Sequence, residues 1–162
     1  MTIKIVEELE APATSGTQPF LPDYLLFLTA SVSAAMSEEF HEHVRTRGLR
    51  VPEWRVLACL HDDDGQMITR LARFAMIEQS RLTRIIDQMD ERGLLERRSD
   101  KADRRRVRIF LTRTGARLAA DLVSEARAHE KRLIKRLPDS LGQDLKATVK
   151  RLHAVLWAGE QD

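Results

Sequence analysis

The apolar positions of the chain recur mostly at three- and four-residue spacing, which is the pattern of helices that bury one face. Such stripes predict six helices, which cover about residues 23–47, 51–61, a short segment after Thr69, 79–92, 114–136 and the region from 138 onward. Gly48 and Gly93 follow two of these stripes at positions typical of helix ends, and Pro52 and Pro138 stand where a helix can begin.

The spacing changes between residues 94 and 111. Apolar residues alternate with Arg108 and Phe110 over residues 107–111, as in a strand exposed on two sides. Together with residues 94–98 and the polar stretch 99–106, this alternation predicts a β-hairpin with a charged loop. The predicted fold class is mostly α with a small β-hairpin, and the order helix, turn, helix, hairpin is that of a winged helix-turn-helix.

This order predicts three regions. Residues 1–19 are rich in proline, glycine and small polar residues and form a flexible N-terminal arm. Residues 51–112 form the winged helix-turn-helix. Residues 20–50 and 113–162 form a helical dimerisation region, because their apolar stripes exceed what a domain of about ninety residues needs. Such a stripe can serve as core or as interface, and two-fold symmetry, the usual partner of palindromic operators, favours an interface.

Charge is distributed unevenly along the 162 residues. The whole chain carries a net charge of +2, whereas residues 80–113 contain eleven basic and six acidic residues and carry +5, which leaves −3 for the remainder. This uneven charge indicates that one face of the protein binds a polyanion, while the remaining surface keeps the protein soluble. A solvated basic loop is the alternative, and charge alone does not decide between the two.

Several classes of protein are disfavoured by the sequence. Charged residues interrupt every apolar stretch before the roughly 18–20 residues that a membrane helix needs, and residues 1–10 lack the apolar core of a secretory signal. The single cysteine, Cys59, permits no intrachain disulfide, and a buried structural thiol is favoured over a redox sensor. These features predict a cytoplasmic protein with no membrane partner.

The second helix of a helix-turn-helix lies in the major groove of double-stranded DNA, where arginine can bind guanine and glutamine can bind adenine. The exposed face of this helix is predicted to carry Gln79, Ser80, Arg81, Thr83, Arg84 and Gln88. The hairpin adds Arg97, Arg98, Arg104, Arg105 and Arg106, and arginine suits a narrow minor groove. An ordinary surface helix and a solvated loop explain each signal alone, but their conjunction in this order favours DNA binding.

Several motifs resemble the MarR (multiple antibiotic resistance regulator) family. They are Leu71-Ala72, the run from Gln79 to Asp87, the run from Arg92 to Arg97, and the wing, which begins Asp103-Arg104-Arg105 and ends Leu-Thr-x-x-Gly at Gly115. The resemblance spans about residues 25–156. It implies an intertwined homodimer built from the first and the last two helices, and a sequence-specific transcription regulator.

The resemblance also implies roles for residues of the wing. Arg105 stands at the position that enters the minor groove, and Asp103 and Arg97 stand at the positions that brace the wing by ion pairing. One departure lies at the start of the recognition helix, where Glu78 occupies the N-cap that Ser, Thr or Asp would cap more strongly. Its carboxylate still interacts favourably with the helix dipole.

Regulators that resemble this family respond to small, often aromatic or anionic effectors bound between the dimer helices and the DNA-binding lobe. The candidate residues here are Met36, Phe40, His43, Trp54, Arg55 and Met76. Trp54 with Arg55 could stack on and pair with an aromatic acid. The alternative is that Trp54 and Met76 are core residues.

Other chemistry finds little support in the sequence. His41 and His43 are two residues apart and point to different faces of a helix, so they form no ready metal pair, and His61 joins them only if the fold brings the two segments together. We predict no metal, no cofactor and no enzymatic activity. The leading hypothesis is a ligand-responsive repressor that binds a palindromic operator as a homodimer. A non-specific architectural DNA-binding protein and a winged-helix protein-interaction module are the alternatives.

Overall fold

The structure is a computed structural model that describes residues 19–100, 103 and 106–157. Residues 1–18 of the predicted N-terminal arm lie outside the described residues, as do Arg104 and Arg105 of the wing. The chain divides into two compact units, residues 1–39 and residues 40–162. None of the described helices is long and apolar enough to cross a membrane.

The described part of the first unit is helical. A 3-10 turn, Leu21–Asp23, precedes α1 (Leu25–Thr46), and the Tyr24 ring stacks on Phe20 with centroids 4.8 Å apart. None of the described residues in this unit is buried, and apolar side chains such as Leu25 (67% exposed) and Leu26 (62%) face outward. An exposed apolar face of this size is typical of a helix that associates with another surface.

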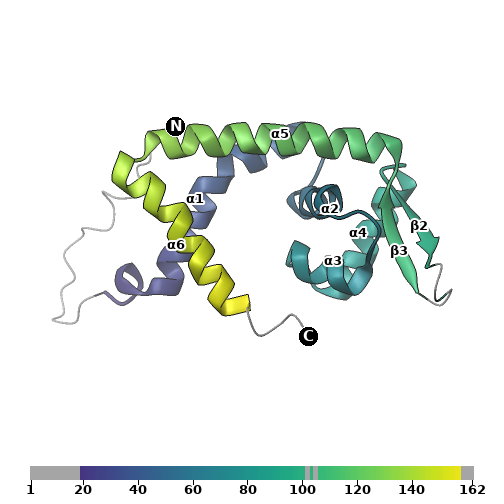
Figure 1. The fold of residues 1–162 in the computed structure, drawn as a ribbon, viewed down its shortest axis with the longest axis horizontal. Coiled ribbons are helices and arrows are strands. Elements are labelled where there is room, and N and C mark those ends of the chain that lie inside the picture. The colour runs from purple at the N-terminus through teal and green to yellow at the C-terminus, as the bar shows by residue number, and fades with distance from the viewer. Residues whose placement is uncertain (1–18, 101–102, 104–105, 158–162) are drawn as a thin grey trace. The chain divides into compact units, whose positions relative to one another are not determined.

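The second unit begins at Phe40 and contains the end of α1 and the remaining elements (Figure 1). These are α2 (Val51–Asp62), β1 (Gln66–Met67), α3 (Ile68–Ala75), α4 (Gln79–Glu91), β2 (Leu95–Ser99), β3 (Val107–Leu111), α5 (Arg113–Arg136) and α6 (Asp139–Trp157). The mostly helical class with a small hairpin is confirmed. The third predicted helix begins at Ile68 instead of after Thr69, and the side chain of its N-cap, Met67, makes no capping hydrogen bond.

The sheet contains one strand more than the predicted hairpin. Its order is β1-β3-β2, and both pairings are antiparallel, with Gln66 and Arg97 each opposite Ile109 on the two sides of β3. Because β1 is only two residues long, it is too short to show the alternation that identifies a strand. β1 ties the wing to the connection between α2 and α3.

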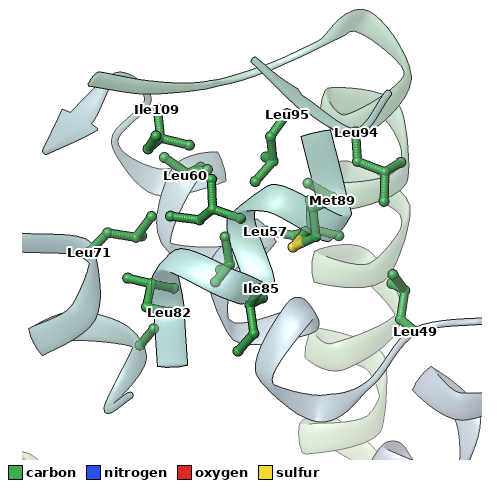
Figure 2. Close-up of a cluster of buried hydrophobic side chains, with 14 of the residues drawn as sticks. Leu49, Leu57, Leu60, Leu71, Leu82, Ile85, Met89, Leu94, Leu95 and Ile109 are labelled. Atoms are coloured by element: carbon green, nitrogen blue, oxygen red, sulfur yellow. The ribbon is translucent and has the colours of Figure 1, made fainter. Parts of the chain in front are cut away.

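One hydrophobic core holds α2, α3, α4, the sheet and α5 together. Figure 2 shows side chains from α2, α3, α4 and the sheet converging, among them Leu57, Leu60, Leu71, Leu82 and Ile109, which have no exposed surface. Leu122 of α5 belongs to the same core. Burying a leucine side chain contributes roughly 1.5–3 kcal/mol. This core fixes α4 on one side and leaves its opposite side facing outward.

The start of α5 is locked to the start of β2. The Thr112 backbone N–H donates to Leu94 O at 3.1 Å, and the Thr112 hydroxyl donates to Gly93 O at 2.7 Å and accepts from Gly115 N at 3.1 Å. A Cβ atom on Gly115 would lie 1.9 Å from Leu94 O, so only glycine fits at this crossing. The Leu-Thr-x-x-Gly motif therefore joins the wing rigidly to α5.

Candidate nucleic-acid interface

The two faces of α4 differ completely. Its buried residues are all apolar: Leu82, Ile85, Ile86 and Met89. Its exposed side chains are polar: Gln79, Ser80, Arg81, Arg84, Gln88 and Glu91. Thr83 is half-buried, and its hydroxyl donates to Gln79 O at 3.0 Å, so this hydroxyl is occupied by the backbone of the helix.

Glu78 caps the start of α4. Its Oε1 accepts from Ser80 N at 2.9 Å, and its Oε2 accepts from Arg81 N at 3.0 Å and from the Ser80 hydroxyl. These hydrogen bonds, first the one from the Ser80 side chain and then those from the two backbone N–H groups, lower the pKa of Glu78 below its usual value. The helix therefore begins where the sequence placed it, and the unusual cap residue makes the capping bonds itself.

The turn between α3 and α4 contains a strained residue. Met76 has a φ of 54°, in the left-handed region, and its backbone N–H donates to the carbonyls of Ala72 and Arg73. Its side chain, which the sequence suggested as a core or effector residue, is 67% exposed. Glycine is the usual residue in such a position because it has no Cβ atom.

The other end of α4 is held by a buried carboxylate on α2. Glu53 is 1% exposed and accepts from the guanidinium groups of Arg50 at 2.8 Å and Arg92 at 3.1 Å. Arg92 also donates to Gly48 O at 2.9 Å, and Arg50 donates to the Gln88 side chain. Gln88, a candidate DNA contact, is thus held by a residue of the α1–α2 connection.

Burial raises the pKa of Glu53, but the hydrogen bonds and charge of Arg50, aided by the charge of Arg92, outweigh it and place this pKa below its usual value. This cluster was not predicted from the sequence. Its signal was the spacing of Arg50 and Glu53, which occupy the N-cap and N3 positions of α2, where the Glu53 carboxylate accepts from the Arg50 backbone N–H at 2.7 Å. The spacing was not recognised because arginine occupies the N-cap, where Ser or Thr is expected.

The described arginines of the wing make contacts within the protein. Arg97 forms an ion pair with Asp87 of α4. Arg98 pairs with Glu96, and its guanidinium lies 4.5 Å from the centroid of the Phe110 ring. These contacts orient two candidate DNA-binding side chains.

Described residues next to the tip of the wing pair with one another. Asp103, one of the two residues expected to brace the wing, pairs with Arg106 at 3.3 Å, and its backbone N–H donates to Asp100 Oδ1 at 3.1 Å. Arg108 pairs with Asp100, which is buried, and donates to Gly65 O at 3.0 Å. Arg108 of β3 therefore connects Asp100, which follows β2, with Gly65, which precedes β1.

Two of the candidate effector residues, His43 and Trp54, lie beside a third, Phe40, which is buried. The Trp54 ring meets Phe40 edge-on at 5.3 Å, and the His43 ring lies at 6.1 Å. Arg55 is half-buried on α2, and Met36 belongs to the first unit. The structure thus brings together Phe40, His43 and Trp54.

A further residue of this cluster, His129 on α5, was missed. It is 8% exposed, its ring lies 5.7 Å from Phe40, and its Nε2 has no hydrogen-bond partner among the described residues. In the sequence, His129 follows Ala126 by three residues and Leu122 by seven, and this spacing places it on the apolar stripe of the helix. A buried side-chain nitrogen without a partner is unusual in folded proteins.

His43 links α1 to α5. Its Nε2 lies 2.7 Å from Glu125 Oε2, and Arg47 Nη1 donates to Glu125 Oε1 at 2.7 Å. The described residues contain no group of three or more potential metal ligands. Burial and the charge of Asp62 raise the pKa of Cys59, which disfavours a reactive thiolate.

A helix-turn-helix with a polar, arginine-bearing second helix and a three-stranded wing defines a winged helix-turn-helix DNA-binding protein. The MarR family model matches residues 49–107. The crystal structure of a MarR family transcriptional regulator from Silicibacter pomeroyi DSS-3 is 52% identical in sequence, covers 85% of this chain and 98% of its own, and has a TM-score of 0.78. The chain belongs to the MarR family of transcriptional regulators.

Two further relatives are more distant. CouR from Rhodococcus jostii RHA1, whose structure was solved bound to p-coumaroyl-CoA, is 28% identical, covers 84% of this chain and 95% of its own, and has a TM-score of 0.68. The organic hydroperoxide resistance transcriptional regulator of Bacillus subtilis (strain 168) is 24% identical over 136 residues, which are 84% of this chain and 89% of that protein.

Proposed function

We propose that the protein is a ligand-responsive repressor that binds a palindromic operator in double-stranded DNA as a homodimer. The observation that carries this proposal is the exposed polar face of α4, which is fixed by four buried apolar residues on its opposite side. In a two-fold dimer, two such helices would enter successive major grooves about 34–36 Å apart.

The side chains near the start of α4 suit direct reading of bases. Arg81 and Arg84 are exposed and can each bind guanine through two hydrogen bonds, and Gln79 can bind adenine. Gln88 is engaged by Arg50, so we assign it to positioning the helix. Arg97, Arg98 and Arg106, together with Arg104 and Arg105, would contact the phosphate backbone or the minor groove.

The dimer would be built from residues 20–50 and 113–162. α6 supports this assignment, because none of its described side chains is buried although many are apolar. The exposed apolar residues of α6 are Leu141, Val149, Leu152, Val155, Leu156 and Trp157. A second copy of the chain that covers this surface would remove the cost of exposing it to water.

The effector would be a small aromatic or anionic molecule bound at the cluster of Phe40, Trp54 and His129. The aromatic rings offer stacking surfaces, and His129 Nε2 offers a hydrogen bond that the described residues leave unmade. CouR, with its bound p-coumaroyl-CoA, is a relative in which an aromatic acyl compound occupies the protein. To reverse DNA occupancy from 99:1 to 1:99, the effector must favour the released conformation by about 5.5 kcal/mol.

A competition binding assay tests the function. An operator is first selected with the purified protein from a library of random duplexes, and its affinity is then compared with that of random duplex. A specific regulator binds its operator about a thousandfold or more tightly than random duplex, whereas a ratio near one would establish an architectural DNA-binding protein.

Two substitutions extend this test. Arg84→Ala should weaken operator binding by roughly 1–3 kcal/mol and relax the base preference at one position. Arg127→Ala, which removes an exposed arginine from α5, is the matched control and should leave binding unchanged. Unaltered regulation by the Arg84→Ala variant would favour the protein-interaction module.

A further inference from the structure

The start of α4 carries a negative charge on the side that the proposed function directs toward DNA. Glu78 is exposed and immediately precedes Gln79, Ser80 and Arg81, the residues at the N-terminal end of the recognition helix. Serine or threonine at this position would cap the helix without a charge, by accepting from one of these backbone N–H groups. A carboxylate here adds repulsion toward DNA phosphates, so capping alone does not explain it.

The Glu78 carboxylate is held in a fixed orientation. Three hydrogen bonds reach it, from the Ser80 N–H, the Arg81 N–H and the Ser80 hydroxyl. A carboxylate offers about four acceptor positions. Among the described residues, three of them are filled, and Oε1 keeps one position for a further donor beyond the end of the helix.

Only two groups in the major groove of DNA can donate to that position: the N4 amino group of cytosine and the N6 amino group of adenine. Adenine places the N7 acceptor beside its amino group, and this acceptor would repel a carboxylate oxygen. Cytosine places a C–H group there instead. The remaining acceptor position of Glu78 therefore fits cytosine better than adenine.

The cytosine is paired with a guanine, whose O6 and N7 atoms accept hydrogen bonds in the major groove. Arg84 lies close enough for its charge to act on the Glu78 carboxylate, and it is exposed on the same helix. An arginine that binds the guanine would complete the recognition of one C·G pair by an acid and a base from one helix end.

We propose that Glu78 is a specificity-determining residue, which accepts a hydrogen bond from the N4 amino group of a cytosine in each operator half-site while Arg84 binds the paired guanine. This inference rests on the proposed operator binding. It assigns to Glu78 a role in DNA recognition in addition to its role as the cap of α4.

The test selects operators from one library of random duplexes with the full-length wild type and two variants. The wild type should enrich cytosine at one position of each half-site, with about tenfold weaker binding when that pair is changed. Glu78→Gln should shift the preference at this position to adenine, because glutamine both donates and accepts. Glu78→Ser keeps a good cap, and it should lose the preference and bind random duplex more tightly.

Thermal unfolding of all three proteins establishes that the helix is retained, and Glu91→Gln, at the other end of α4, is the matched control for loss of charge. If both Glu78 variants fold and select the wild-type operator with the same preference at every position, Glu78 is a cap only and the inference is overturned. If the wild type itself selects no sequence over random duplex, the proposed function fails, and the inference fails with it.

Discussion

Arg92 Nη1 lies 3.1 Å from Glu53 Oε1, and this ion pair joins the residue that ends α4 to a buried carboxylate of α2. Because Glu53 also binds Arg50, whose side chain holds Gln88, a single carboxylate connects the α1–α2 connection with the recognition helix at two points.

Glu53→Gln should lower the free energy of unfolding by about 2–3 kcal/mol at neutral pH, because it leaves two arginines without their shared partner. Folding lowers the pKa of Glu53 below its ordinary value of 4.5. Its stabilisation is therefore complete above that value and is lost as pH falls through the folded-state pKa. Urea unfolding at several pH values should show the difference between wild type and variant shrinking in acid.

Glu42→Gln is the control for this change, since it alters an exposed carboxylate of α1 whose side chain is 72% exposed. It should change stability by less than about 0.5 kcal/mol. A pH-independent loss of stability in Glu53→Gln would contradict the role of the charge.

Met76→Gly should raise the free energy of unfolding by about 1 kcal/mol, because it removes the clash of a Cβ atom at a φ of 54°. For a chain of this size, thermal unfolding should record an increase of roughly 2–4 °C. Arg73→Gly, within the last turn of α3, should instead destabilise by about 1 kcal/mol. Equal effects of the two substitutions would show that the left-handed conformation is not strained.

Gly115→Ala should destabilise the protein by about 3 kcal/mol or more, because its Cβ atom would lie 1.9 Å from Leu94 O and the backbone must move. Gly93→Ala is the matched control: its φ is 66°, but no atom lies within 4 Å of the added Cβ, so its cost is only about 1–2 kcal/mol. Denaturant midpoints of the two variants measure the difference, and similar midpoints would refute the steric lock between α5 and the wing.

His129→Phe should stabilise the protein without effector by about 1 kcal/mol, because it removes a buried nitrogen that has no partner among the described residues. His43→Phe is the opposite case: it breaks the 2.7 Å contact with Glu125 and should destabilise. Chemical denaturation compares them. A loss of stability in His129→Phe would mean that the buried nitrogen already contributes a favourable interaction.

Leu152→Lys combined with Leu156→Lys should convert the proposed dimer into a monomer, because both side chains are at least half exposed on the apolar face of α6. Sedimentation equilibrium measures the mass, and operator affinity should fall together with dimerisation. Lys150→Glu, also exposed on α6, is the control and should sediment as the wild type does. A double variant that stays dimeric would place the interface elsewhere.

The helices and the core of the winged helix-turn-helix could be predicted from the sequence, because the spacing of apolar residues within a segment identifies the helix that the segment forms. The i, i+3, i+4, i+7 pattern of Leu82, Ile85, Ile86 and Met89 fixed both the existence and the orientation of α4. The same logic failed for β1, because two residues, Gln66 and Met67, carry no period. Their pairing depends on β3, which is distant in the sequence.

The polar contacts were harder to predict for the same reason, because they join residues that are distant in the sequence. Residues joined by the Glu53 cluster come from three segments, and Arg92 lies 39 residues from its partner. The pairing of Arg97 with Asp87 likewise depends on how the hairpin lies against α4. Sequence spacing identified which side chains face outward, but only the fold shows which of them are already engaged.

The order of the sheet also bears on the tendency of its open edges to pair with strands of other molecules. β3 is paired on both sides, so the open edges belong to β1, which has two residues, and β2, which carries the charged residues Glu96, Arg97 and Arg98. A short edge and a charged edge are two ways in which proteins prevent edge-to-edge aggregation. The arginines that we assign to DNA thus also guard the free protein against the addition of a strand from another molecule.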